Sequence, residues 1–214
     1  MKKRTLIQTI ALGLALGASA SAMAQATWKP TKPINLIVPW AAGGSTDQIT
    51  RIAAAEIEKT LGQKIVVVNQ PGASGSIGSK NAWDAPRAGY TWTAGAAQDL
   101  GTYQSLGMLN AGIKDWHLFL HVANIAVVSV NPCTPYQNIG QSLDAMKTKS
   151  DIKVATAGVT SGGHNAMEAI VAVTGSKYRH VTYDGGNPAV ISTVSGETDA
   201  TTELAVEQAE MIRG

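Results

Sequence analysis

The 214-residue sequence predicts an α/β protein with parallel or mixed sheets. One observation is a pattern of strand, Gly-rich turn and helix that begins four times, near residues 34, 64, 152 and 178. Strands that alternate with helices in this way are typical of parallel sheets covered by helices. A second observation is the run KIVVVN at residues 64–69, which has the continuous apolar character of a parallel strand buried on both faces.

The first 24 residues are expected to be a secretory signal peptide, outside the fold. Lys2, Lys3 and Arg4 give a charged start, and an apolar run follows at residues 6–16. This run is shorter than the roughly 20 residues that a membrane-spanning helix needs. The segment ends in the small-x-small motif AMA, so cleavage is expected after Ala24 and the mature chain is expected in the periplasm.

The composition of the remaining chain excludes several classes of function. Without the three basic residues of the signal, 14 of the 17 Lys and Arg remain against 15 Asp and Glu, and they form no basic cluster that would bind nucleic acid. Cys133 is the single cysteine, so an internal disulfide and a CxxC site are excluded. His117 and His121 have a metal-binding spacing for a helix, but their surroundings favour a strand. We therefore predict no metal and no cofactor.

The elements follow in order along the chain. The expected strands are residues 34–39, 64–69, 90–94, 152–157, 178–183 and 198–204. The apolar stretch at 118–131 is long enough to be a strand that crosses from one domain into another. The expected helices are residues 47–61, 76–85, 164–174, 188–195 and an incipient helix at 206–213. Gly62 is expected to end the first helix, and Asn187 before Pro188 is expected to cap the fourth. The predicted lobes are residues 25–123 and 124–214.

The Gly-rich turns lie at the carboxyl ends of strands, where open α/β sheets bind their ligands. The four turns are residues 41–46, 70–75, 158–163 and 184–187. A helix that begins there offers unpaired N–H groups and the positive end of its dipole, which favour an anion. The first and third turns carry hydroxyls and neither Lys nor Arg, so N–H and O–H donors would hold a carboxylate. The simpler interpretation, that these glycines only make tight connections, stays open.

Two enzymatic interpretations are weaker. The sequence has neither a GxxxxGK[ST] phosphate loop nor the GxGxxG dinucleotide motif. A serine hydrolase would use Ser161 as the nucleophile, His164 or His180 as the base, and Asp184 or Asp199 to orient that base. Its G-x-S-x-G motif lacks the first glycine, because Val159 occupies that position. We therefore predict that the protein is not an enzyme.

Several segments, in order, resemble the substrate-binding proteins of tripartite tricarboxylate transporters, the Bug family. The matching segments are KPINLIVPWAAGGSTD (32–47), LGQKIVVVNQPGASGSIG (61–78), GYT (89–91), residues 131–136, residues 155–164 and HVTYDGGNPA (180–189). The resemblance implies a type II periplasmic-binding-protein fold, with two lobes around a ligand cleft. It also implies that the second lobe and the C-terminal return are incomplete, because members of the family continue beyond the position of Gly214.

The resemblance further implies a monomer that binds a small carboxylate and delivers it to a membrane permease of one large and one small subunit. The alternative is a periplasmic sensor in which the same lobes dock on a signalling receptor. Many relatives carry Lys or Arg where this chain has Asp184, which would disfavour a second ligand carboxylate. The expected ligand-binding residues are Trp40, Ala42, Gly43, Gly44, Ser45, Thr46, Asp47, Thr160, Ser161, Gly162, Gly163, His164, Asp184, Gly185, Gly186 and Asn187.

Overall fold

The computed structural model describes residues 28–119 and 122–213. The predicted signal peptide and His121 lie outside these residues. From Lys32 onward the chain forms one compact unit that contains two separate sheets. In the part of the chain that the structure describes, no helix has the length and apolar character to cross a membrane.

The first sheet has three parallel strands in the order β2-β1-β3. They are β1 (Ile34–Val38), β2 (Ile65–Asn69) and β3 (Thr91–Thr93). The central strand β1 is the most buried of the three, because four of its five residues are buried and it has a neighbouring strand on each side. Ile34 and Leu36 pack with Ile65 of β2 and Ala54 of the following helix, which forms the core of this sheet.

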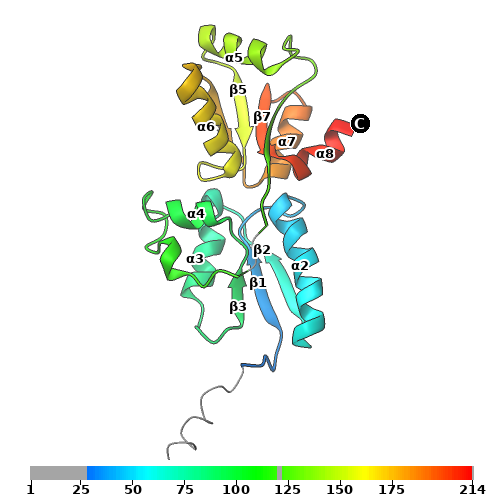
Figure 1. Cartoon of the computed structure of the whole chain (residues 1–214), viewed down its shortest axis with the longest axis vertical. Helices are drawn as coiled ribbons and strands as arrows, with labels where there is room; N and C mark the ends of the chain where they lie inside the picture. Colours follow the sequence, from blue (N-terminus) through cyan, green and yellow to red (C-terminus); the bar gives the residue numbers. More distant parts are fainter. Residues whose placement is uncertain (1–27, 120–121, 214) are drawn as a thin grey trace, which may run out of the picture. The chain divides into compact units, whose positions relative to one another are not determined.

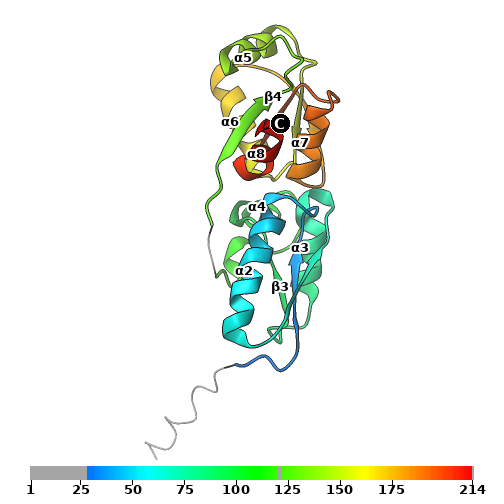
Figure 2. The same ribbon diagram turned by 90° about the vertical axis from the view of Figure 1, so that its right-hand side faces the viewer.

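Three helices accompany the first sheet: α2 (Ser45–Leu61), α3 (Ser76–Asp84) and the short α4 (Ala97–Thr102). The 3-10 turn η1 (Ala73–Gly75) lies between β2 and α3, and η2 (Ile113–Asp115) follows α4. Both ribbon views show α2 and α3 on opposite sides of the sheet (Figures 1 and 2). As predicted, α2 ends at Gly62, whose φ of 66° is easily adopted by glycine and whose N–H donates to Glu58 O.

The second sheet has four strands in the order β4-β7-β5-β6, and it is mixed because β4 runs antiparallel to β7. Its strands are β4 (Ala126–Val130), β5 (Lys153–Thr156), β6 (Arg179–Thr182) and β7 (Ala200–Leu204). Its helices are α5 (Ile139–Thr148), α6 (Gly162–Thr174), α7 (Gly186–Val194) and α8 (Ala205–Arg213). Figure 1 shows α6 on one side of β5 and β7, with α7 and α8 on the other.

The predicted fold class is confirmed, and most element ends are within two residues of the prediction. We predicted that residues 118–131 could form one long strand. This prediction is wrong for residues 118–119 and 122–125, because the strand covers only Ala126–Val130. Residues 117–119 likewise form no strand. Asn187 is not the cap of α7, which begins one residue earlier with Gly185 at the N-cap position. Helices α4 and α5 were not predicted from the sequence. The lobe boundary at residues 123–124 stays a prediction.

Candidate functional site

The turn after β1 is shaped by Asp47, in the first turn of α2. Its carboxylate accepts hydrogen bonds from Gly43 N at 3.0 Å and Asn69 Nδ2 at 2.9 Å, and it pairs with Arg51 at 2.9 Å. Burial acts to raise the pKa of Asp47, but the hydrogen bonds from Arg51, Gly43 and Asn69 outweigh it and keep the pKa below its usual value. Asp47 therefore holds the turn in place.

A carboxylate from a distant part of the chain lies at the start of α2. Ser45 N donates to Glu207 Oε1 at 2.7 Å, and Leu204 N donates to Glu207 Oε2 at 3.1 Å. Glu207 is in the first turn of α8 and is only 9% exposed. Gly186, the first residue of α7, touches the same carboxylate so closely that a Cβ there would collide with it. The carboxylate thus has the environment that helix N-termini provide for anions.

Glu203 brings a second carboxyl group to this place, from the end of β7. Its Oε1 accepts a hydrogen bond from Ala157 N, and the residue is 1% exposed. Burial, and then the negative charge of Glu207, raises the pKa of Glu203 well above its ordinary value. The cost of placing a second negative charge beside the Glu207 carboxylate thus disfavours ionisation of Glu203.

The first and fourth Gly-rich turns meet beside Glu207. Ala41 N donates to Asp184 O at 2.9 Å, and a Cβ on Gly43 would lie 3.2 Å from Asn187 Nδ2. Gly185, with a φ of 153°, packs its backbone against Ala41 in a conformation that other residues rarely adopt. The structure therefore brings together predicted site residues from both sheets. Among the other residues of these turns, Ala42 is exposed, Gly44 is buried and Thr46 is half-buried.

The second and third turns form another pair. Val159 N donates to Ser74 Oγ at 3.0 Å, and Thr160 Oγ1 donates to Ser74 O at 3.2 Å. Gln98 Nε2 of α4 also reaches Thr160 O at 3.3 Å. The hydroxyl of Thr160 is therefore already used within the protein. Each sheet thus contributes one turn to each pair.

Ser161 serves as the N-cap of α6, where its Oγ accepts a hydrogen bond from His164 N at 3.1 Å. The rings of His164 and His180 stack with centroids 4.0 Å apart. His180 Nε2 lies 2.6 Å from Thr156 Oγ1, and His164 Nδ1 lies 3.3 Å from the hydroxyl of Tyr178. These contacts direct both rings to groups other than the Ser161 hydroxyl, unlike the triad that a hydrolase would need.

The histidine pair is partly buried, which disfavours the charged form of both rings. Burial lowers the pKa of His164, and burial together with the neighbouring His164 lowers the pKa of His180 to about 4. Among residues 28–119 and 122–213, no group of three or more His, Cys, Asp or Glu is arranged to hold a metal ion.

Trp40 has a packing role in the structure. It is 6% exposed and forms a cluster with Val38 and Ala157. A Cβ on Gly75 would lie 2.9 Å from Trp40 Cζ2, so the indole also fits closely against the second turn. Contact between Trp40 and a ligand stays a prediction.

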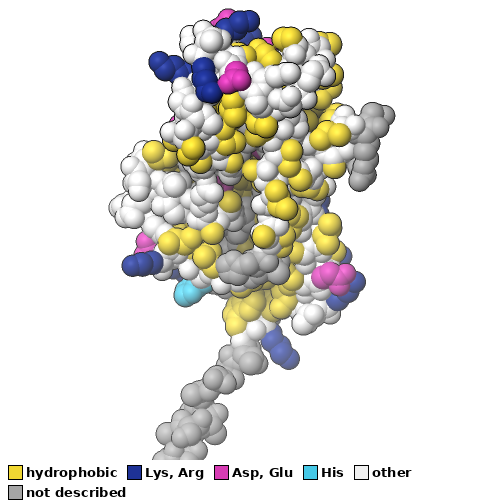
Figure 3. All heavy atoms as spheres, turned by 45° about the horizontal axis from the view of Figure 1, so that its top comes forward, with side chains coloured by type: hydrophobic (Ala, Val, Ile, Leu, Met, Phe, Trp, Pro, Cys, Tyr) yellow, Lys and Arg dark blue, Asp and Glu magenta, His cyan; other side chains and the backbone are white. Residues whose placement is uncertain are grey.

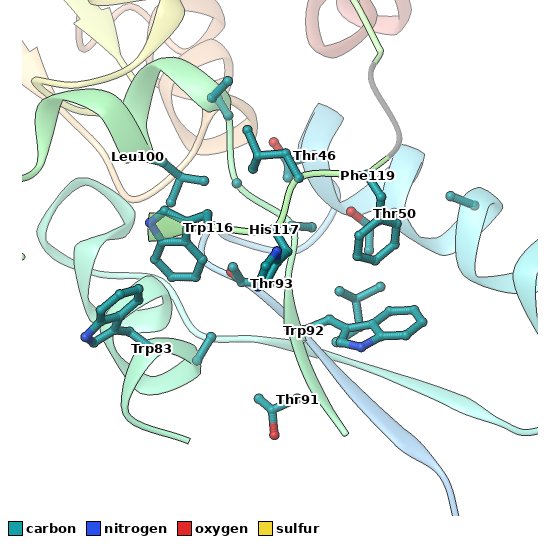
Figure 4. A pocket seen from close by; sticks show the side chains of 18 of the residues that line it. Thr46, Thr50, Trp83, Thr91, Trp92, Thr93, Leu100, Trp116, His117 and Phe119 are labelled. Carbon is teal, nitrogen blue, oxygen red and sulfur yellow. The ribbon is translucent and has the colours of Figure 1, made fainter. Parts of the chain in front are cut away.

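A pocket of about 790 Å³ opens beside α2 and β3, within the size range of small-molecule sites. Trp83 stacks at a tilt on Trp116 with centroids 5.2 Å apart, and Trp92 meets Phe119 edge-on at 5.1 Å. Figure 4 shows these aromatic side chains around the pocket, with His117 between the two pairs. The space-filling view shows hydrophobic side chains gathered on one face of the molecule, with charged side chains toward its edges (Figure 3).

The pocket was missed because its tryptophans lie far apart in the sequence, on separate elements. It also reaches the predicted site, because Thr46 and Gly162 line it together with Leu204. Glu203 and Glu207 were missed too, although one signal for them was present. Glu203 is an acid within an otherwise uncharged buried strand, and such a residue requires a proton or a partner.

Two α/β sheets whose helix N-termini meet around an anion have the architecture of a solute-binding protein. The sequence profile described as "Tripartite tricarboxylate transporter family receptor" matches residues 49–214. The chain belongs to this family, and the predicted resemblance is confirmed.

The relatives and solved structures agree with this assignment. A UPF0065 protein of the tcbD-tcbE intergenic region in Pseudomonas sp. (strain P51) is 28% identical over 94% of this chain and 61% of its own length. The periplasmic binding protein BugD superposes with a TM-score of 0.73 at 25% identity, over 86% of this chain and 62% of BugD. MatC from Rhodopseudomonas palustris with bound malate has a TM-score of 0.76 at 25% identity, over 86% of this chain and 64% of MatC. The chain therefore spans about three fifths of these proteins.

Proposed function

We propose that this chain is the solute-capturing component of a tripartite carboxylate uptake system in the periplasm. It binds a small carboxylate at the start of α2, where the first and fourth turns meet, and delivers the carboxylate to a membrane permease of one large and one small subunit. The third turn, with Gly162 and Gly163, borders the same place through Leu204 and β7.

One observation carries the carboxylate assignment. The N–H of Ser45 already binds a carboxylate, that of Glu207, at 2.7 Å in a buried environment. The donor therefore has the position and polarity that a ligand carboxylate requires. The malate bound to MatC gives further support, because that protein has the same fold and a carboxylate solute.

A change at Ser45 tests this proposal with little disturbance of the helix. Ser45 is the first residue of α2, a position that favours proline, and Gly44 before it has the extended conformation that precedes proline. Ser45→Pro removes the N–H donor, whereas the matched control Ser45→Ala keeps it and removes only the hydroxyl. Carboxylates such as malate, succinate, adipate and benzoate would be screened against each protein by thermal shift and calorimetry.

The expected result is a raised melting temperature of the wild-type protein with at least one carboxylate, because ligand at 100 times its Kd stabilises a fold by about 2.7 kcal/mol. Ser45→Pro should weaken carboxylate binding by roughly tenfold or more, because it removes a hydrogen bond to a charged group. Ser45→Ala should change carboxylate binding little. Equal carboxylate affinity in both variants would show that Ser45 N does not bind the ligand. A cooperative melt without any carboxylate effect would contradict the function itself.

A further inference from the structure

The carboxylate of Glu207 occupies the N–H donor of Ser45, which the proposed function gives to a solute. Its two oxygens accept separate hydrogen bonds, from Ser45 N at 2.7 Å and Leu204 N at 3.1 Å. We propose that Glu207 is an internal occupant of the anion site, which a carboxylate solute must displace in order to bind. This inference rests on the proposed function and adds a residue that sets the affinity of the site.

The backbone around Glu207 is shaped to admit a carboxylate. A Cβ on Gly186 would collide with its carboxyl group, and a Cβ on Gly44 would lie 3.3 Å from its Oε1. Glycines at both positions thus leave room for a carboxylate between the starts of α2 and α7. The contact also joins residues 162 positions apart in the chain, so local sequence does not impose it.

The first turn of α2 has no other side chain at this donor. Gly44 at its N-cap has no side chain to bond to the helix N–H groups. Asp47 is the acid in that turn, but its carboxylate is engaged by Gly43 N, Asn69 Nδ2 and Arg51. The N–H of Ser45 is therefore available to a carboxylate that comes from elsewhere, and Glu207 fills that place.

Competition follows from this geometry. The single N–H of Ser45 cannot bind two carboxylates at full strength, and two negative charges at hydrogen-bond distance from one donor repel each other in a buried environment. A solute carboxylate can therefore bind Ser45 N only when the Glu207 carboxylate moves away from this donor.

The first test is amide hydrogen exchange of the full chain without any solute. Ser45 has no intrahelical partner for its N–H, because it is the first residue of the helix. Protection of this amide in the wild-type protein, and its loss in Glu207→Ala, is the expected result. Rapid exchange of Ser45 in the wild-type protein would overturn the proposal.

The second test compares malate affinity in the wild-type protein, Glu207→Gln and Glu207→Ala. Glu197→Gln is the matched control, because Glu197 is an exposed acid between α7 and β7. Removal of the competing charge should tighten malate binding by about tenfold or more in Glu207→Ala, because a hydrogen bond to a charged group has about this value. The gain in affinity should be smaller in Glu207→Gln. The control should bind malate as the wild-type protein does.

The outcomes separate the two proposals. If the wild-type protein binds malate and both Glu207 variants bind it equally or more weakly, this inference is wrong and the proposed function stands. If Ser45 is protected but no Glu207 variant gains affinity for malate, Glu207 is a structural tie and the inference is again wrong. If no protein in the series binds any carboxylate, the proposed function fails as well.

Discussion

Asp99, on the short helix α4, carries a carboxyl group and is buried, with only 2% of the residue exposed. Burial raises its pKa to about 7, although hydrogen bonds with Thr160 and with the backbone of Ala96 act in the opposite direction. Its Oδ1 has no hydrogen-bond partner within the described residues. Asp99 is therefore protonated in the folded protein over a range where the unfolded chain is ionised.

Asp99 should make the protein less stable as the pH rises from about 4 to about 7. In this window the folded state keeps a proton that the unfolded state has lost, so stability is complete below the unfolded pKa and falls until the folded pKa is reached. Asp99→Asn should remove a slope worth up to roughly 4 kcal/mol, and denaturant unfolding at several pH values measures it. The exposed Asp151→Asn is the control, and an unchanged slope in Asp99→Asn would contradict the prediction.

His180 contributes with the opposite sign. Its pKa of about 4 lies below the value of about 6.5 expected for an unfolded chain, so the stability it gives above pH 6.5 is lost as the pH falls toward 4. The wild-type profile is thus a sum of opposing slopes. For this reason the Asp99 experiment compares variants and does not interpret the wild-type curve alone.

Helix α6 packs closely on β7 through one glycine. A Cβ on Gly163 would collide with the carbonyl oxygen of Thr202, whereas a Cβ on the preceding Gly162 would have Leu204 Cδ2 as its nearest neighbour, at 4.0 Å. Backbone atoms cannot move aside as a flexible side chain can. The two adjacent glycines therefore have different roles, although both belong to the same Gly-rich turn.

This difference predicts contrasting effects of the same substitution. Gly163→Ala must separate α6 from β7 and should cost about 1–3 kcal/mol or more in the free energy of unfolding. Gly162→Ala should be neutral or stabilise by up to about 1 kcal/mol, because alanine is the better helix former. Urea denaturation of both variants provides the measurement, and a similar loss of stability in the two would refute the packing argument.

The sequence predicted elements well where local chemistry determines them. Apolar runs predicted β1 and β2, and Gly62 predicted the end of α2. The prediction missed α4, which is only six residues long. It also missed α5, although Ile139, Leu143 and Met146 have helical spacing and the Asn138 side chain caps the helix. It also assigned the cap of α7 to Asn187, whereas α7 begins at Gly186 with Gly185 at the N-cap position. Which turns would meet, and that Glu207 would join them, depends on contacts between residues up to 162 positions apart.

At the scale of the whole molecule, the pocket beside α2 and β3 is a large opening with aromatic walls. Such surfaces bind apolar molecules, since removal of apolar area from water is favourable. The tryptophans at its walls make this binding observable, because a bound dye would quench or accept their fluorescence. Figure 4 shows Trp92 and Trp116 among the pocket side chains.

A neutral apolar dye such as Nile red should therefore bind the full chain and reduce tryptophan emission. Ala53 lines the pocket, so Ala53→Phe should fill part of it and weaken dye binding by several-fold. Ala55→Phe is the control, because Ala55 is exposed on the same helix and does not line this pocket. Equal dye binding by the two variants would place the dye elsewhere.

The strand order of the second sheet has a consequence for synthesis on the ribosome. Strand β7 lies between β4 and β5, yet it comes after all the other strands of the described residues. Until residues 200–204 emerge, β4 has no neighbour with which to form its ladder, whereas β1, β2 and β3 of the first sheet can assemble much earlier. The nascent chain should therefore acquire protease resistance in two stages, an early one for the first sheet and a late one as β7 inserts.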